Sequence, residues 1–276
     1  MATRQTLDIM AIRYGEDFCE TRQVADGAAR VGGVEVSFHP AGHVLGSAQI
    51  RLACDDGPVI VVSGDYCRTP NPVCAPWEPV ACDIFVTEAT FGLPVFKHPD
   101  PAGEMTRLLA SMAEFPERHH LIGAYALGKA QRVIALVRQA GHDGPIHLHG
   151  AVQRLTDYHV EQGIALGDLR PATGAPKDAL RGHIVLSPPG ALNDRWSRRL
   201  PDPITAMASG WMHLRGMRRR YGVDRGFALS DHADWPGLVS AQTGWRHSPS
   251  PAKAPPAASA MPASRTRCIA ATGAAA

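Results

Sequence analysis

Residues 38–50, FHPAGHVLGSAQI, place His43 in a short loop of Gly, Pro and small residues between two strand-like stretches. The preceding VGGVEVSF and the following AQIRLAC both alternate apolar and polar residues, which is the period-2 pattern of half-buried strands. The sequence therefore predicts two neighbouring strands joined by this loop. His43 is then either a metal ligand at a strand end or an ordinary residue of the turn.

The next strand-like segments also end at polar side chains. DDG at 55–57 favours a hairpin, after which PVIVVSGD is continuously apolar up to Ser63 and is followed by Asp65. A further apolar run, in CDIFVTEATFG, ends at Glu88. Because a rigid sheet fixes the loops at its strand ends, we expect these side chains to be gathered at one edge of a sheet.

Near residue 94 the sequence pattern changes from successive strand-like segments to helix-like segments that alternate with short strands, which predicts an inserted second unit. Helix-like segments such as AGEMTRLLASMAEF then alternate with short strands such as PIHLHG, and RGFALSDHADWPGL resumes the earlier strand-then-polar pattern. We expect a first part at 1–93, an insertion at 94–225 and a return to the first part at 226–243. From 244 to 276 Pro, Ala and Ser dominate without periodicity, which predicts a disordered tail.

Composition excludes several classes of protein. The 276 residues are 45% hydrophobic and 20% charged, as is usual for a globular protein. A formal net charge of +2 does not by itself indicate nucleic-acid binding, so the placement of the charges has to decide. The six cysteines form no CxxC pair and no run of about 18 apolar residues occurs, so we expect a cytoplasmic protein with no membrane segment.

Each strand-end residue also has an ordinary structural interpretation. Asp65, at the end of a buried strand, needs a cation, a metal ion or backbone N–H groups as a partner. Glu88 could cap or salt-bridge a loop, and His232, which lies between Asp231 and Asp234, could belong to a helix N-terminus. A carboxylate bonded to the His232 ring would instead fix its tautomer and raise its basicity. Taken together, the segments that carry these residues indicate a functional site more specifically than any one of them does alone.

Two basic segments are candidates for contacts with phosphate groups. GAYALGKA at 123–130 matches part of a phosphate-binding loop, but Ala130 replaces the Ser or Thr that would hold Mg²⁺, which argues against a nucleotide hydrolase. Lys129 and Arg132, near a predicted helix start, are still suited to phosphate contact. The run at 215–225 is either a solvated face or a surface for backbone phosphates. Its three consecutive arginines are Arg218, Arg219 and Arg220.

In this order, the motifs resemble the β-CASP branch of the metallo-β-lactamase fold, and within it the bacterial ligase-associated DNA exonucleases, often described as mRNA 3′-end processing factors. The resemblance covers about residues 5–240. Its motifs are FHPAGHVLGSAQI, VVSGDYCRTPNP, TEATFG, AYALGKAQRV, HGAV, ASGWM and RGFALSDHADWPGL. The resemblance implies an α/β protein, an αββα metallo-β-lactamase sandwich into which a β-CASP α/β domain is inserted at 94–225.

Carried over to matching positions, the resemblance gives each strand-end residue a role. His43 matches a zinc-binding histidine, and Asp65 matches the carboxylate that bridges two zinc ions. Glu88 matches an acidic residue that supports the metal site through a histidine, and His232 matches a histidine near the scissile phosphate. Such zinc ions activate water and stabilise the phosphodiester oxygens, while His232 would act as general acid to the leaving 3′ oxygen. Arginine and lysine side chains of the insertion would position the strand.

The implied function is zinc-dependent phosphodiester hydrolysis, as 3′-end trimming of DNA beside an ATP-dependent DNA ligase and a helicase. RNA processing by the same site is an alternative, because recognition of the 2′-hydroxyl leaves no short motif. The family's HxHxDH motif is absent from this sequence, and where the family has a further histidine after a short strand downstream of SDHADW, this sequence instead enters its Pro- and Ala-rich segment. We therefore expect an incomplete core, a fragment with a late start and a frameshifted end. A non-catalytic nucleic-acid-binding fragment is the second alternative.

Overall fold

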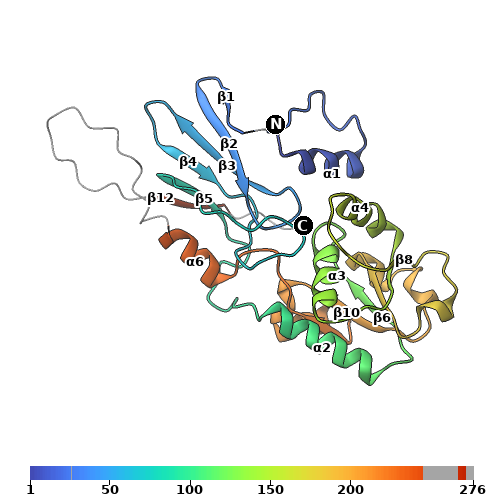
Figure 1. The fold of residues 1–276 in the computed structure, drawn as a ribbon. Coiled ribbons are helices and arrows are strands. Elements are labelled where there is room, and N and C mark those ends of the chain that lie inside the picture. The colour runs from blue at the N-terminus through green and yellow to red at the C-terminus, as the bar shows by residue number, and fades with distance from the viewer. Residues whose placement is uncertain (26, 245–266, 272–276) are drawn as a thin grey trace. The chain divides into compact units, whose positions relative to one another are not determined.

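The computed structural model describes residues 1–25, 27–244 and 267–271, which divide into two units (Figure 1). Unit 1 contains Met1–Pro70, Cys74–Lys97 and the described residues from His232 onward. Unit 2 contains Asn71–Val73 and His98–Asp231. Each unit holds helices and its own sheet, so the α/β class predicted from the sequence is confirmed.

The sheet of unit 1 has the order β1-β2-β3-β4-β5-β12 within the described residues. Its strands are β1 (Ala29–Val31), β2 (Val34–Pro40), β3 (Ala48–Cys54), β4 (Val59–Val62), β5 (Ile84–Glu88) and β12 (Arg267–Ala271). Neighbours from β1 to β4 are antiparallel, whereas β5 runs parallel to β4. The predicted strands around the quoted loop, and the hairpin after β3, are confirmed.

Helix α1 (Arg4–Tyr14) is joined to the loop between β2 and β3. The Thr3 hydroxyl accepts a hydrogen bond from the N–H of Thr6 and donates to the carbonyl oxygen of Gly46 at 2.7 Å. The Thr6 hydroxyl donates to the same carbonyl oxygen at 3.0 Å. A side chain at Gly46, whose φ is +78°, would collide with Gln5. The N-cap therefore attaches the helix to the loop that carries His43.

The end of the chain differs from the disordered tail predicted for 244–276. Residues Arg267–Ala271 form β12, which pairs in parallel with β5 and places Cys268 opposite Phe85. This prediction is wrong for that segment, because the edge of β5 supplies backbone partners that a sequence without periodicity does not reveal. Helix α6 spans Trp235–Gly244. The remainder of the expected tail, 245–266 and 272–276, lies outside the described residues.

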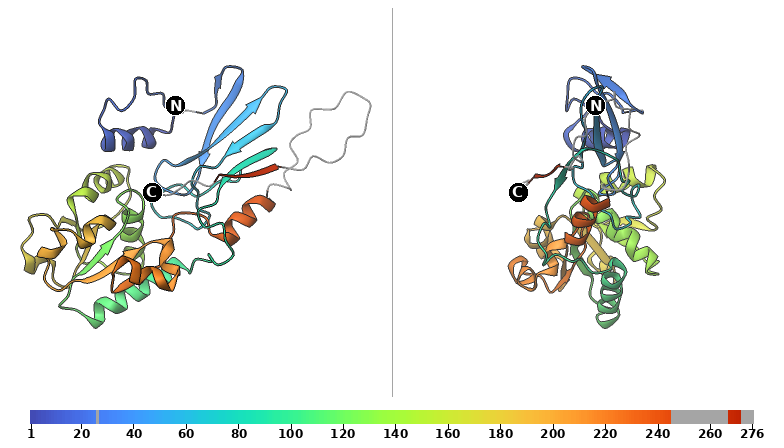
Figure 2. Two further views of the ribbon diagram at one scale, coloured as in Figure 1. Left: turned by 180° about the vertical axis from the view of Figure 1, so that it is seen from behind. Right: turned by 90° about the vertical axis from the view of Figure 1, so that its left-hand side faces the viewer.

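Unit 2 is built on a parallel sheet with the order β11-β10-β6-β9-β7-β8 (Figures 1 and 2). The strands are β6 (His120–Gly123), β7 (Ile146–Leu148), β8 (Leu169–Pro171), β9 (Ile184–Ser187), β10 (Ile204–Ala208) and β11 (Arg225–Phe227). The helices are α2 (Pro101–Glu114), α3 (Lys129–Gln139), α4 (Gly150–Glu161) and α5 (Arg215–Tyr221). Short 3₁₀ helices are η1 (Lys177–Leu180), η2 (Pro189–Asn193), η3 (Ser197–Arg199) and η4 (Gly210–His213).

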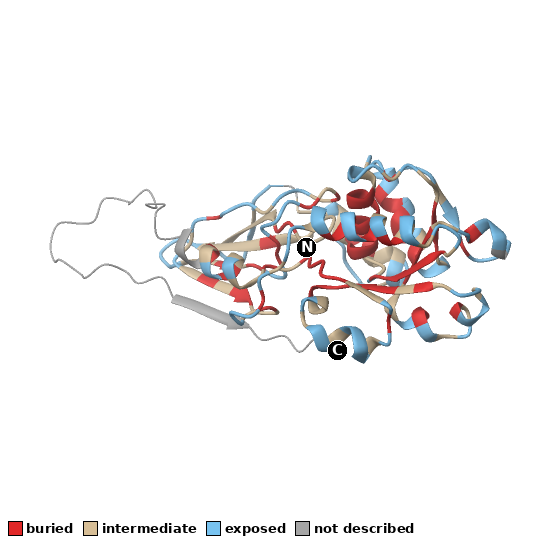
Figure 3. Cartoon of the chain, turned by 90° about the horizontal axis from the view of Figure 1, so that it is seen from below, coloured by how far each residue is buried: buried red, intermediate tan, exposed pale blue. Residues whose placement is uncertain are grey.

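Both faces of this sheet are covered, which explains its continuously apolar strands. Ile122 and Leu186 pack into one cluster with residues of α2, α3 and α4, whereas Leu121 and Val185, their neighbours in sequence, pack into a second cluster with residues of η1 and η2. This is the alternation expected of a strand. Figure 3 marks the buried residues in red.

The borders of the units differ from the expected insertion at 94–225. Unit 2 begins at His98 and ends at Asp231, and it also includes Asn71–Val73. The strand expected to return to the first part, β11, instead pairs with β10, placing Phe227 opposite Ala208. The sequence pattern predicted the strand β11 but not the strand that pairs with it, because both sheets have apolar strands beside which β11 could lie. Among the described residues, none of the helices combines the length and the apolar character needed to cross a membrane.

Candidate metal centre

Three strand ends at one edge of the unit 1 sheet carry predicted site residues. The loop with His43 follows β2, Asp65 follows β4, and Glu88 is the last residue of β5. Since β2 and β4 both run antiparallel to β3, and β5 runs parallel to β4, these strand ends meet at the same edge. His232, the first residue after unit 2, completes the set.

The structure brings His43, Asp65 and His232 together as one group. Each offers a ligand atom, and these atoms all lie within 4.8 Å of one another. Nε2 of His43 is 3.8 Å from a carboxylate oxygen of Asp65, and Nδ1 of His232 is 4.0 Å from the other oxygen. The two imidazole rings lie 4.7 Å apart, centroid to centroid. The side chain of Asp65 is 54% exposed, so the group is accessible to a ligand.

Backbone contacts hold the His43 loop in place. The N–H groups of His43 and Val44 both donate to the hydroxyl of Ser47, at 3.2 and 3.1 Å. The N–H of Cys67 donates to the carbonyl oxygen of Ala41 at 3.0 Å, which connects this loop to the segment that carries Asp65. Gly42 has a φ of +71°, and a side chain there would collide with the carbonyl oxygen of Cys67. Only glycine allows the two loops to approach this closely.

Glu88 orients His232. One carboxylate oxygen lies 2.9 Å from Nδ1 of His232, and the other accepts the backbone N–H of Tyr66 at 2.8 Å. Burial of Glu88, which is 7% exposed, opposes its ionisation. The hydrogen bond and charge of His232, with the N–H of Tyr66, outweigh burial and hold the pKa of Glu88 below its ordinary value. An ionised Glu88 accepts from Nδ1 and fixes the tautomer of His232.

The donor set fits one zinc ion. Two imidazoles and one carboxylate are ligands that zinc accepts, and catalytic zinc sites use three protein ligands with one position left open. Within the described residues, no second group of His, Cys, Asp and Glu side chains is gathered in this way. The described side chains thus fit a single ion, whereas the resemblance implied two. His232 also joins the candidate ligands, although the sequence suggested only a catalytic role.

Lys129 and Arg132, expected to contact nucleic acid, lie instead in the interior of unit 2. Nζ of Lys129 is 2.9 Å from one carboxylate oxygen of Asp231, and a guanidinium nitrogen of Arg132 is 3.1 Å from the other. The side chains of Lys129 and Arg132 are 5% and 1% exposed. That prediction is therefore wrong for both residues, because the buried carboxylate of Asp231 takes up their charges.

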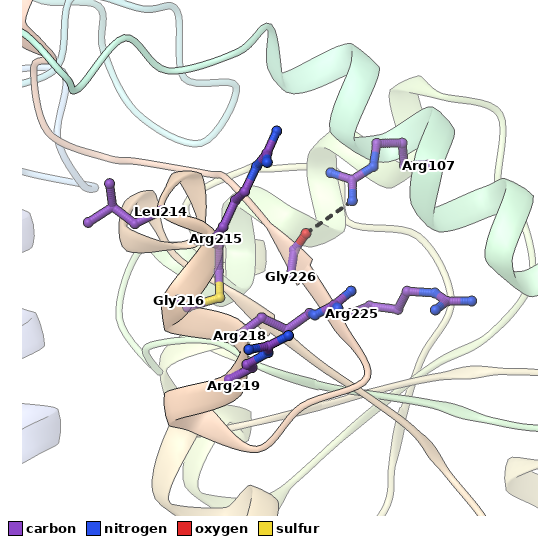
Figure 4. A pocket seen from close by; sticks show the side chains of 9 residues that line it. Arg107, Leu214, Arg215, Gly216, Arg218, Arg219, Arg225 and Gly226 are labelled. Carbon is purple, nitrogen blue, oxygen red and sulfur yellow. Dashed lines mark hydrogen bonds between the residues drawn. The ribbon is translucent and has the colours of Figure 1, made fainter.

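Arg218, Arg219 and Arg220 lie on α5 and are exposed, which leaves their charges available to a ligand. Arg218 and Arg219 line a cavity of unit 2, whereas Arg220 does not (Figure 4). The three consecutive arginines therefore occupy different surroundings.

The chain is similar to a ligase and to RNA-processing proteins. No family model matches the sequence. It is 29% identical over 238 residues to a probable DNA ligase of Opitutus terrae, covering 86% of this chain and 22% of the ligase. It is 26% identical over 160 residues to the RNase aCSPSF2 of Saccharolobus solfataricus, covering 56% of this chain and 30% of that protein.

A third relative is the cleavage and polyadenylation specificity factor subunit 3 of Dictyostelium discoideum, 31% identical over 109 residues, covering 38% of this chain and 14% of that protein. The chain therefore spans at most 30% of the length of these three relatives.

A solved structure has a similar fold. The crystal structure of a protein of unknown function from Enterococcus faecalis V583 matches with a TM-score of 0.52 and 14% identity, covering 87% of this chain and 63% of that chain. A ligase and RNA-processing proteins are the relatives expected for motifs that run in order from FHPAGHVLGSAQI to RGFALSDHADWPGL. These similarities are consistent with the resemblance of the chain's motifs to the β-CASP branch of the metallo-β-lactamase fold.

Proposed function

We propose that this chain is part of a metal-dependent nuclease that trims DNA at its 3′ end. The observation that carries the proposal is the group formed by His43, Asp65 and His232, whose ligand atoms lie within 4.8 Å of one another. In this proposal unit 1 is an incomplete metallo-β-lactamase sandwich, and unit 2 is the inserted β-CASP domain.

The three residues of the group would hold one zinc ion. A bound zinc ion supplies Lewis-acid chemistry, which stabilises the negative charge that develops on phosphodiester oxygens during hydrolysis. Asp65 is the most exposed of the three side chains, so the ion would be reached from its side of the group. His43 and His232 are each about one-fifth to one-quarter exposed.

Glu88 and His232 act as a pair in the proposed reaction. The carboxylate of Glu88 holds the proton on Nδ1 of His232, which leaves Nε2 as the atom that binds a ligand or hands a proton to the leaving 3′ oxygen. Metal content separates these two roles: the variant His232→Ala loses zinc if the ring is a ligand, and keeps it if the ring serves only as the acid.

DNA is the substrate that the similarities favour. The match to the probable DNA ligase extends over 86% of this chain, whereas the match to RNase aCSPSF2 extends over 56%. We place the activity in the cytoplasm, beside an ATP-dependent DNA ligase and a helicase. RNA processing is the second candidate, supported by the names of the RNA-processing relatives.

The test measures zinc and cleavage together. The purified chain is assayed for bound zinc by mass spectrometry and for shortening of 5′-labelled single-stranded DNA and RNA. We expect zinc to be bound and DNA to be shortened, and both to be lost in His43→Ala. The control is His39→Ala, because His39 is a half-buried histidine of unit 1 that pairs with Glu78 and lies outside the group.

Three results would overturn parts of the proposal. Equal zinc content in the chain and in His43→Ala would refute the metal group. Zinc binding without cleavage of either strand would leave a non-catalytic nucleic-acid-binding fragment. Cleavage of RNA alone would replace the DNA assignment by the RNA-processing alternative.

A further inference from the structure

Unit 2 contains an open cavity of about 520 Å³ whose lining is strongly basic. It is formed by residues of α2, η4, α5 and β11 (Figure 4). The basic side chains in its lining are Arg107, Arg215, Arg218, Arg219 and Arg225. The rest of the lining is apolar or glycine, and none of the lining residues is acidic.

Two of these arginines are held by carboxylates. The guanidinium of Arg107 donates to both carboxylate oxygens of Glu104, at 2.9 and 2.7 Å, and Arg225 lies 3.5 Å from Glu114. Glu104 is itself 5% exposed and accepts the backbone N–H of Ala228 at 2.9 Å. Arg107 also donates to the carbonyl oxygen of Gly226 at 3.4 Å, the bond drawn in Figure 4. One wall of the cavity is therefore fixed in position.

The other three arginines have no carboxylate partner among the described residues. In the part of the chain that the structure describes, Arg215, Arg218 and Arg219 make no ion pair with a carboxylate. Like charges gathered in a concave surface repel one another and raise the local positive potential. An anion that entered the cavity would relieve this repulsion, which gives the cavity a preference for negatively charged ligands.

The geometry suits a phosphate group on a strand. Guanidinium groups bind phosphate oxygens through two parallel hydrogen bonds, and their planar faces stack on nucleobases. The arginines come from three separate elements and surround the cavity, as Figure 4 shows, so they reach a ligand from several directions. Apolar side chains beside them, Met212 and Leu214, offer contact to the sugar or the base.

We propose that this arginine-lined cavity binds the phosphate backbone of single-stranded nucleic acid and so anchors the strand on unit 2. The inference rests on the proposed function, since it takes nucleic acid to be the substrate. It adds a binding surface that does not use the metal group, and it replaces Lys129 and Arg132 as the source of phosphate contacts.

The test measures binding without cleavage. Fluorescence anisotropy with a labelled single-stranded DNA is recorded in EDTA, which removes metal and prevents hydrolysis. The test variant removes three charges from the cavity: Arg215→Ala, Arg218→Ala and Arg219→Ala. We expect it to bind about tenfold more weakly or worse, and the slope of log affinity against log salt to fall by about 2, because each phosphate contact contributes about 0.7.

A control variant removes the same charge from unit 2 outside the cavity. It combines Arg198→Ala, Arg199→Ala and Arg220→Ala, which are exposed and do not line the cavity. We expect it to bind within about threefold of the unaltered chain, since none of the three charges that it loses lines the cavity. Circular dichroism confirms that both variants keep their fold, which is expected because all six side chains are exposed.

The outcomes separate this inference from the proposed function. Equal weakening in the two variants would show that only net charge matters, and unaltered binding in the cavity variant would also overturn the inference. If the chain shortens DNA while the cavity variant binds normally, the cavity proposal fails and the nuclease proposal stands. If the cavity variant alone loses binding but no strand is ever cut, the cavity proposal stands and the nuclease proposal fails. Preference for duplex over single-stranded DNA would refute the single-strand assignment.

Discussion

The surroundings of the imidazole rings differ between the two units. In unit 1, Nδ1 of His232 lies 2.9 Å from a carboxylate oxygen of Glu88. His120, on β6, is fully buried in unit 2, and its Nε2 lies 2.9 Å from the hydroxyl of Ser111. Burial lowers the pKa of His120 to about 4. Burial therefore keeps the imidazole of His120 neutral at pH values at which an imidazole in water takes up a proton.

The lowered pKa of His120 predicts a specific loss of stability in acid. The ordinary pKa of the ring is 6.5, so as the pH falls from 6.5 towards 4 the unfolded chain takes up a proton that the folded chain refuses. The contribution of His120 to the free energy of unfolding is therefore fully present above pH 6.5, and it decreases as the pH falls from 6.5 towards 4. Between pH 7 and pH 4.5 we expect this residue to account for about 2 kcal/mol of the decrease.

The measurement compares urea unfolding of the chain and of His120→Gln at the two pH values. Glutamine cannot take up the proton, so the variant should lose less free energy of unfolding between pH 7 and pH 4.5. The other histidines titrate in both proteins and cancel in the comparison. Equal losses in the two proteins would show that His120 is protonated in the folded state as readily as in the unfolded state.

At the scale of elements, the loop between β2 and β3 depends on glycine. Gly42→Ala places a methyl group against the carbonyl oxygen of Cys67 at a left-handed φ of +71°. We expect the free energy of unfolding to fall by at least about 1 kcal/mol, and zinc binding to weaken because His43 and Asp65 move apart. Calorimetry and zinc titration measure the two effects.

The control for this change is Gly103→Ala in α2. Apart from its two chain neighbours and the nearby backbone of α2, no atom of the described residues lies within 4 Å of the position that a methyl group at Gly103 would take, and the φ of Gly103 is not positive. Alanine there should therefore stabilise the helix by about 0.5–1 kcal/mol. If Gly42→Ala is as well tolerated as Gly103→Ala, the close approach of the two loops does not occur in solution.

Elements were predictable from the sequence where periodicity and turn residues agree. The strands around His43 alternate cleanly, and DDG marks the next hairpin, so β2, β3 and β4 follow from local pattern. The strands that pair with β11 and β12 could not be predicted from local pattern. Strand pairing is decided by which sheet edge offers free backbone groups, and no short stretch of sequence records that choice.

At the scale of the whole molecule, the candidate site could be predicted in part. His43, Asp65 and His232 stand out because each follows a strand-like run, and the sheet register then brings them together. The burial of Lys129 and Arg132 could not be predicted, since a basic residue at a helix start has the same sequence pattern whether it faces solvent or a buried carboxylate. The distinction comes from packing between distant segments.

The division into units makes a prediction for Val73, which stands in sequence between two segments of unit 1. Val73 is fully buried in the apolar cluster of unit 2, together with Leu108 and Ile134. Val73→Ala should therefore lower the stability of unit 2 by about 2 kcal/mol through lost burial and the cavity left behind. Hydrogen exchange followed by mass spectrometry should show faster exchange in β6 and β9, with β2 and β3 unchanged.

The control for Val73→Ala is Val61→Ala. Val61 is equally buried but belongs to the cluster of unit 1 with Phe85, so its loss should speed exchange in the unit 1 strands instead. The pair of variants gives opposite patterns only if each cluster stabilises its own unit. If both variants speed exchange across both sheets alike, the two units unfold together and Asn71–Val73 cannot be assigned to either one by stability.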